Sequence, residues 1–431
     1  MLKKWLFLTL IISVVLLVGV ALKNANAIPT FARVYRTSCS TCHAVFPKLT
    51  AFGEAFRRNG YQFPEGTDPE FVKEEPVSLG AEAYKEVFPN AIWPGAIPHL
   101  PAISVVAEGE LLYLPEAEEG QPKLSFDEAA AEVDMLMSGT ISENISFFWE
   151  LNFADDGLEI EMGTINFSNL LASHLKPNLL NFRIGKLVPE FVANGHRGLA
   201  THHPWLSIKN VGDNKWTLLD SQKGIELNGI IAGRLGYDVG LVEGRNNLPN
   251  TDKDPYIHLA YKLGGMRLDG VTKEGMVLNT SQPWRDNSIT IDGFAYLGFA
   301  NIEAVQADGK TKLPQEDNFQ MFGGDANLFF KDLNLLGGVA LEHHSQPTVK
   351  KEAMNAVHIF GEADYVFYPW LVPVVRFEAF NFESETDIRI LPVVNILIRA
   401  NVKSVIRAEI EKEGSGDFEL EEVEGALAIG F

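Results

Sequence analysis

The chain has 431 residues, with 57 acidic against 36 basic side chains and a formal net charge of −21 at pH 7. Nucleic-acid binding relies on Lys and Arg to neutralise phosphates, so this acidic balance argues against a nucleic-acid partner. A length above 400 residues ordinarily predicts two or more domains, and a single large barrel is the main exception.

Residues 1–27 are predicted to be a secretory signal peptide. Lys3 and Lys4 form a positive start, residues 5–22 are almost entirely apolar, and Ala25-Asn26-Ala27 is a small-residue cleavage site. The apolar run is about long enough to span a bilayer, which leaves an uncleaved anchor as the alternative. Loss of three lysines and no acids would take the net charge from −21 to −24. We therefore expect an exported protein.

The next feature is Cys39-Ser40-Thr41-Cys42-His43, which has the C-x-x-C-H pattern of a c-type haem attachment site. This spacing places two thiols on one turn to fix a porphyrin, followed at once by an imidazole that reaches the iron from the same side. We predict one covalently bound haem c, with Cys39 and Cys42 as its attachments and His43 as the proximal ligand of the iron. Half a zinc site and a thioredoxin-like redox pair are the alternatives. The first lacks a second cysteine pair, and the second lacks a βαβ setting.

Residues 28–63 form the predicted haem segment, with a short helix that begins at Pro47 and ends at an Asn59-Gly60 cap. Because domains below about 40 residues seldom hold together unaided, another part of the chain must cover the second face of the haem. The segment is also basic, and its cations are candidates to pair with haem propionates, with carboxylates of the lumen, or with solvent alone. These cations are Arg33, Arg36, Lys48, Arg57 and Arg58.

Residues 64–101 contain seven prolines and are predicted to be a linker. From residue 102 to residue 431 the pattern alternates with period two. For example, Ile257 and Leu259 alternate with His258 and Ala260. About sixteen such segments follow one another, many of ten residues or more, which is the length that a tilted strand needs to cross a membrane. The predicted fold is all-β, an approximately 16-stranded outer-membrane barrel preceded by a small α-helical haem segment.

The connections support the same topology, because barrels have short turns on the periplasmic side and longer loops outside. Residues 189–222 and 301–317 are predicted to be long connections, and residues 265–286 break the rule, so that the strand count is uncertain by two there. Tight turns are predicted near residues 233–234, 331–332 and 369–370. A cluster of aromatic residues at 365–370 is typical of an interfacial girdle. We therefore expect the protein to be located in the outer membrane of a Gram-negative bacterium.

The N-terminal segment resembles that of fused cytochrome–porins, which join one c-type haem to an outer-membrane barrel and include ferrous-iron-oxidising cytochromes. The resemblance rests on Pro29 to Arg33, the C-x-x-C-H motif, Phe46 to Gly53 and Arg58 to Tyr61, about 35 residues in all. It implies the same roles for the two cysteines and the histidine. The stretch Phe56 to Gly60 is more similar to sister proteins of unassigned role, so the resemblance leaves the substrate open.

Four histidines are candidates for the sixth ligand of the iron. His258 and His358 point to the lumen by alternation, His99 lies at the end of the linker, and His196 lies in the longest loop. A lumen histidine is also an ordinary polar liner, so the sequence does not choose among them.

The leading functional hypothesis is electron transfer across the outer membrane through the single haem. The expected partners are a periplasmic cytochrome or copper protein, an extracellular donor or acceptor such as Fe(II), and outer-membrane lipid. One alternative is a diffusion porin whose haem segment acts as a plug or sensor, and another is a periplasmic haem peroxidase. Whether the chain is an enzyme, for example a ferrous-iron oxidase, is left undecided by the sequence.

Overall fold

The structure is a computed structural model that describes residues 30–431 with several gaps. The gaps are residues 64–67, 73, 79–84, 93–94, 118–120, 127–132, 155–156, 192–199, 201–204, 206–207, 219–220, 245–251, 271–280 and 307–308. The predicted signal peptide, residues 1–27, lies outside the described residues. Within the described part of the chain, none of the helices is long and apolar enough to cross a membrane.

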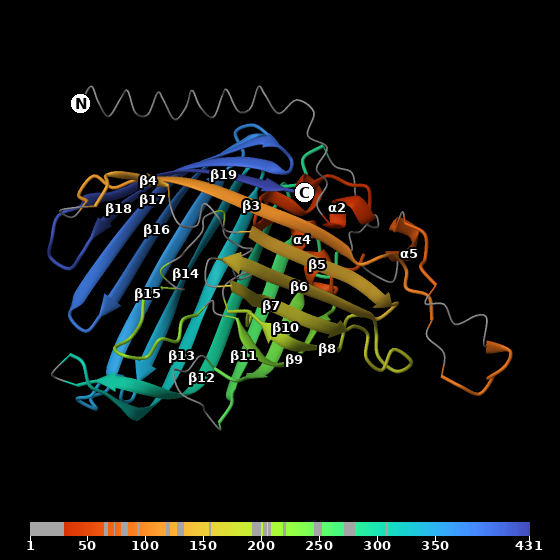
Figure 1. Cartoon of the computed structure of the whole chain (residues 1–431), viewed down its shortest axis with the longest axis horizontal. Coiled ribbons are helices and arrows are strands. Elements are labelled where there is room, and N and C mark those ends of the chain that lie inside the picture. The colour runs from red at the N-terminus through yellow and green to blue at the C-terminus, as the bar shows by residue number, and fades with distance from the viewer. Residues whose placement is uncertain are drawn as a thin grey trace.

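Antiparallel strands form one closed barrel (Figure 1). They are β3 (Ala102–Tyr113), β4 (Leu124–Phe126), β5 (Val133–Ser142), β6 (Ile145–Ala154), β7 (Gly157–Phe167), β8 (Asn181–Leu187), β9 (Gln222–Ile231), β10 (Leu235–Val242), β11 (Asp254–Gly264), β12 (Ser288–Val305), β13 (Lys312–Phe330), β14 (Leu333–His344), β15 (Met354–Tyr365), β16 (Leu371–Phe382), β17 (Glu385–Arg399), β18 (Val402–Lys412) and β19 (Glu419–Gly430).

The described residues give a barrel of sixteen strands, because β4 and β5 are two parts of one strand position. Both pair with β3, β5 along residues 102–107 and β4 along residues 111–113. The last strand, β19, pairs with the first from Val423 opposite Tyr113 to Gly430 opposite Val106, which closes the cylinder. The predicted fold class is therefore confirmed, including the strand number.

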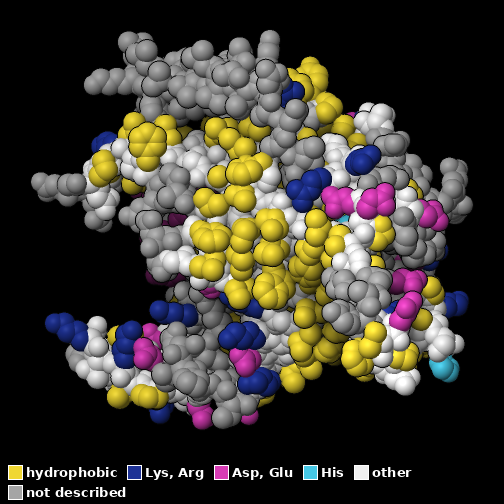
Figure 2. Space-filling model, turned by 45° about the vertical axis from the view of Figure 1, so that its right-hand side comes forward, with side chains coloured by type: hydrophobic (Ala, Val, Ile, Leu, Met, Phe, Trp, Pro, Cys, Tyr) yellow, Lys and Arg dark blue, Asp and Glu magenta, His cyan; other side chains and the backbone are white. Residues whose placement is uncertain are grey.

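The alternation seen in the sequence separates a lipid face from a lumen face. In β11, Ile257 and Leu259 are 43% and 46% exposed, whereas His258 and Ala260 between them are buried. Figure 2 shows hydrophobic side chains as a broad band across the outside of the barrel, with charged side chains gathered beyond its lower edge. An outward apolar band with a polar interior is the pattern of a barrel that lies in a bilayer.

One of the predicted long connections needs correction. Residues 301–317 are mostly strand, because β12 and β13 extend as a long hairpin and leave only 306–311 between them. The connection between β11 and β12, residues 265–287, is long although it lies on the side of the tight turns, and no additional strands of the barrel are described there. The connection predicted at 189–222 spans 188–221 between β8 and β9.

The N-terminal segment comprises α2 (Thr30–Val34), α3 (Cys39–Cys42), β1 (His43–Val45), β2 (Lys48–Leu49) and α4 (Ala51–Arg58), followed by a short α5 (Asp68–Phe71). Helix α4 begins at Ala51 and not at Pro47, because Thr50 is the cap and residues 43–49 form a small hairpin. The predicted C-cap at Asn59 is confirmed. Figure 1 shows α2 and α4 beside the rim of the barrel near the C-terminus.

Candidate functional site

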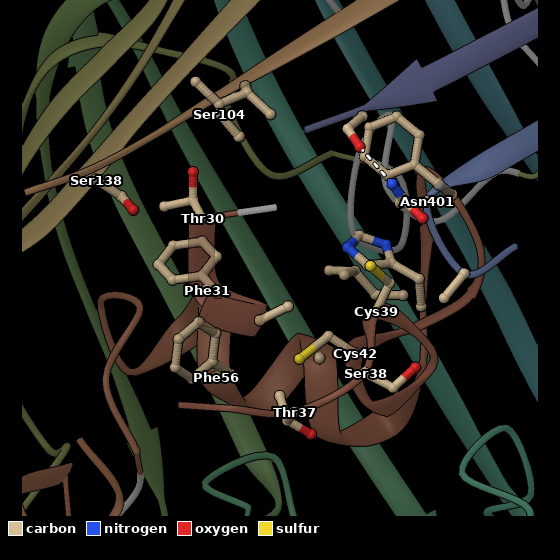
Figure 3. A pocket seen from close by; sticks show the side chains of 18 of the residues that line it. Thr30, Phe31, Thr37, Ser38, Cys39, Cys42, Phe56, Ser104, Ser138 and Asn401 are labelled. Atoms are coloured by element: carbon tan, nitrogen blue, oxygen red, sulfur yellow. Dashed lines mark hydrogen bonds between the residues drawn. The ribbon is translucent and has the colours of Figure 1, made fainter. Parts of the chain in front are cut away.

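Cys39 to Cys42 of the C-x-x-C-H motif form a single helical turn, α3, and His43 begins β1. Ser38 and Thr50 both make hydrogen bonds to this turn. Ser38 caps α3, and its hydroxyl accepts a hydrogen bond from the amide of Ser40. Thr50, which caps α4, binds the same turn, because its hydroxyl donates to the carbonyl of Thr41 at 2.9 Å and its amide donates to that of Cys42 at 2.8 Å. In Figure 3 both cysteines lie on one side of a cavity, with Phe31 and Phe56 beside them.

This cavity lies between the N-terminal segment and the barrel wall, and its empty volume, counted out to the open mouth, is about 1370 Å³. The lining of this cavity is mainly apolar, as is common for cofactor pockets. From the N-terminal segment the cavity is lined by Cys39, Cys42, His43, Phe46, Phe52 and Phe56, among others. From the barrel it is lined by Ser104, Val106, Leu136, Phe148, Leu397, Asn401, Lys403 and Ala428, among others.

His43 is oriented by a backbone contact. Its Nδ1 donates to the carbonyl of Pro47 at 3.0 Å, and its ring lies 5.2 Å from the ring of Phe46, centroid to centroid. A hydrogen bond donated by Nδ1 fixes the tautomer in which the proton is on Nδ1 and Nε2 is unprotonated, which is the usual arrangement of a metal-binding histidine. In this tautomer Nε2, and not Nδ1, is the ring nitrogen of the type that ligates metals.

The two cysteines are free thiols in an environment that disfavours thiolates. Burial raises the pKa of Cys42 to about 12 and also raises that of Cys39. A reactive redox C-x-x-C pair depends on a thiolate, which a lowered pKa provides. Among the described residues, no group of three or more His, Cys, Asp or Glu side chains is arranged to hold a metal ion. The raised pKa values of the two thiols therefore oppose the redox-pair alternative.

Three cations of the N-terminal segment bind carboxylates of the barrel interior. Lys48 contacts Glu362, at 3.2 Å, and Asp364 of β15. Arg57 binds Glu190 with both terminal nitrogens. Arg58 lies 3.5 Å from Asp238 of β10. Because β10 and β15 are far apart around the barrel, these pairs anchor the segment inside the lumen. Of the partners considered from the sequence, the structure gives these three cations carboxylates of the lumen.

Other contacts extend the docking to the remaining wall. Tyr61 stacks on Phe148 of β6 with ring centroids 4.7 Å apart, and Gln62 donates to the hydroxyl of Thr140 in β5 at 3.3 Å. Lys403 of β18 donates to the carbonyl of Phe46 at 3.0 Å. The segment is thus held by strands on several sides of the barrel.

The described parts of the connection 188–221 also pack inside the lumen. Phe191 and Trp216 are buried against inward-facing rings, with Trp216 donating from its indole nitrogen to the hydroxyl of Tyr296 at 3.0 Å. Trp205 is buried, and its amide donates to Glu378 of β16. This connection meets the N-terminal segment through Glu190, the partner of Arg57. The lumen therefore holds two inserted segments that contact each other.

Three of the four candidates for the sixth ligand lie away from this cavity. His258 is hydrogen-bonded to Asp238 at 2.9 Å, and His358 to Glu342 at 2.8 Å. His99 is buried, and its Nδ1 donates to the carbonyl of Leu100. None of these three is among the described residues that line the cavity. His196 lies outside the described residues.

Two residues of this site escaped the sequence analysis. Glu190 and Lys403 are charged residues in a long loop and on a strand, and they follow the motif by more than 140 residues. No local pattern marks them. For Lys403 the only signal is alternation, which places a long cationic side chain on the lumen face of β18.

No family model matches this chain, and no curated relative does. Solved structures do resemble it. The outer membrane channel DcaP of Acinetobacter baumannii has a TM-score of 0.51 at 9% identity, covering 77% of this chain and 97% of that one. The in-vitro folded outer membrane protein OmpT of Vibrio cholerae has a TM-score of 0.51 at 10% identity, covering 79% and 98%. OmpF of Salmonella typhi, solved with daunomycin, has a TM-score of 0.51 at 9% identity, covering 77% and 97%.

At these identities the likeness concerns the fold alone. It agrees with the closed sheet of sixteen strands and with the apolar outer band described above. The chain is therefore an outer-membrane β-barrel with the fold of the porins.

Proposed function

We propose that this protein carries electrons at the outer membrane through one covalently bound c-type haem, held between the N-terminal segment and the barrel wall. One observation carries the proposal: the two cysteines and the histidine of a C-x-x-C-H motif line an apolar cavity whose opposite wall is the barrel. A cytochrome fused to a porin would need such a cavity, and the N-terminal sequence resembles that family.

The residues of the cavity fit such a group. The thiols of Cys39 and Cys42 would hold it through thioethers, and Nε2 of His43 would bind its iron. Once bound, a haem supplies reversible one-electron transfer. The rings of Phe52 and Phe56 form part of the apolar lining of the cavity. An apolar, low-dielectric lining is one of the factors that set a haem potential.

The partners follow from the position of the cavity. It lies at the rim that carries the tight turns and both described ends of the chain, which is the periplasmic side in bacterial barrels. A periplasmic cytochrome or copper protein is therefore the proposed partner on that side. An extracellular donor or acceptor, with Fe(II) as one candidate, is the proposed partner on the other.

A diffusion channel with a haem-bearing plug is the second candidate, and the fold it shares with outer-membrane channels favours it. The packing of Trp216 and Phe191 inside the lumen favours the electron carrier instead, because these residues occupy space that a diffusing solute would need. Single-channel conductance of the purified protein in planar bilayers separates the two. Large open currents that ignore the redox state would support the channel and refute the electron carrier.

The direct test is a reduced-minus-oxidised spectrum of isolated outer membranes, together with haem staining after denaturing electrophoresis. We expect covalent haem in the wild type, none after C39A/C42A, and normal amounts after the matched control S40A, which changes a residue inside the motif that carries no predicted haem contact. Absence of haem from the wild type would refute the proposal. A six-coordinate low-spin spectrum would count against a peroxidase, and failure of Fe(II) to reduce the haem would remove iron alone.

A further inference from the structure

Lys403 is a buried lysine of the barrel wall that faces the candidate haem cavity. It lies near the start of β18, and only 4% of it is exposed. It lines the same cavity as His43, although 360 residues separate the two in the sequence. A buried ammonium is costly unless its charge is compensated, so its contacts require an explanation.

The contacts of Lys403 differ from those of the other buried lysine of the site. Lys48 pairs with two carboxylates. Among the described residues, by contrast, no carboxylate lies within 4 Å of Lys403 Nζ, and Glu108 and Glu424 act on it only from a greater distance. Its hydrogen bond goes to the backbone carbonyl of Phe46 at 3.0 Å. The lysine is therefore not one of the ion pairs that anchor the segment.

Phe46 belongs to the two-residue turn that also orients the histidine. Lys403 Nζ binds the carbonyl of Phe46, and Nδ1 of His43 donates to the next carbonyl in the chain, that of Pro47, at 3.0 Å. The ring of Phe46 lies 5.2 Å from the imidazole and 6.0 Å from the ammonium. The Phe46–Pro47 turn therefore accepts one hydrogen bond from Lys403 of the barrel and one from His43 of the motif.

We propose that Lys403 is a positioning residue for His43: the barrel wall, through the Phe46–Pro47 turn, sets the orientation of the imidazole that binds the iron. The inference rests on the proposed haem function. Its physical basis is that groups around a metal-bound histidine orient its ring and tune its basicity, although they do not touch the metal. It explains how a small segment obtains a fixed ligand geometry: part of that geometry comes from the barrel.

The test compares K403M, K403Q and K403R with K412M, a matched control at the far end of the same strand. Each protein is checked first for barrel folding by the heat-dependent shift in gel mobility, and for covalent haem by staining. We then record absorption spectra and midpoint potentials. We expect K403M to retain covalent haem but to lose or broaden the bands of histidine-ligated haem, and K403R, which keeps a donor, to restore them. K412M should match the wild type.

Three outcomes would overturn the inference. Wild-type bands in K403M would show that the turn holds without the lysine. Equal shifts of potential in K403M and K403Q, with unchanged bands, would show that only the charge matters. Broadened bands in K403R as well as in K403M would show that any change of side chain disturbs the wall. Absence of haem from the wild type would instead refute the proposed function, so the two failures are distinguishable.

Discussion

Replacing Gly53 by alanine should loosen the packing of α4 against the C-x-x-C turn. A Cβ added at Gly53 would lie 2.1 Å from the carbonyl oxygen of Cys42 and 2.9 Å from its carbon. Ordinary contact begins at 3.4 Å, so the two backbones must separate by about 1.3 Å (3.4 Å less 2.1 Å). Both partners are backbone, and no side-chain rotation can relieve the overlap.

The size of the effect follows from two opposing contributions. Overpacking a tight site costs about 1–3 kcal/mol, and the absence of a rotamer escape favours the upper part of that range. Alanine gains about 1 kcal/mol over glycine in a helix. We therefore expect the free energy of local unfolding of α4 to fall by about 1–2 kcal/mol, which corresponds to roughly 5- to 30-fold more of the open state.

Hydrogen exchange of the membrane-inserted protein measures this without relying on haem. The amides of α4, such as that of Asn59 bonded to the carbonyl of Ala55, should exchange faster by that factor in G53A. The control is G109A in β3, where an added Cβ meets nothing within 4 Å. Unchanged protection of α4 in G53A would refute the reasoning.

Three further results are expected. K48M removes the ammonium that pairs with the buried carboxylates of Glu362 and Asp364, although Glu362 keeps Arg376 at 3.9 Å. Breaking a buried ion pair costs about 3–5 kcal/mol, so residues 30–63 should become sensitive to protease in membrane vesicles. The matched change K186M, in a partly exposed ion pair, should leave them protected. W216A removes a buried indole worth about 3–5 kcal/mol and should raise single-channel conductance; a wild type that already conducts as much would contradict this. Burial raises the pKa of Cys42 to about 12, so its thiol stays protonated below that pH. In folded, haem-free protein, maleimide labelling of Cys42 should therefore be slow at pH 8 and should become faster as pH rises. Fast labelling at pH 8 would contradict the burial.

Much of the fold was predictable because it depends on repeating local patterns. Period-two alternation places Ile257 and Leu259 on one face and His258 on the other whatever the partners of the strand, since successive side chains of a strand point to opposite faces. Strand ends were harder to predict. Residues 301–317 are polar enough for a loop, yet β12 and β13 pair through most of them, because a hairpin that extends beyond the bilayer carries no requirement for an apolar face.

The candidate haem motif could be found from the sequence alone, because the residues that would carry its chemistry lie within the five consecutive positions of C-x-x-C-H. The need for an outside wall followed from the size of the segment. The residues that form that wall could not be predicted from the sequence. Lys403 meets the Phe46 carbonyl, and Glu190 meets Arg57, only because closure of the barrel brings distant segments together.

The sequence by itself therefore determined the motif, the barrel and the approximate number of strands, since each is set by spacing along the chain. The tertiary structure alone decided which carboxylates receive Lys48, Arg57 and Arg58 and how the connection 188–221 enters the lumen. It also placed His258 and His358 beside carboxylates rather than at the cavity. Alternation gives the face of a strand to which a side chain belongs. The register and curvature of the closed sheet give the neighbour that it meets.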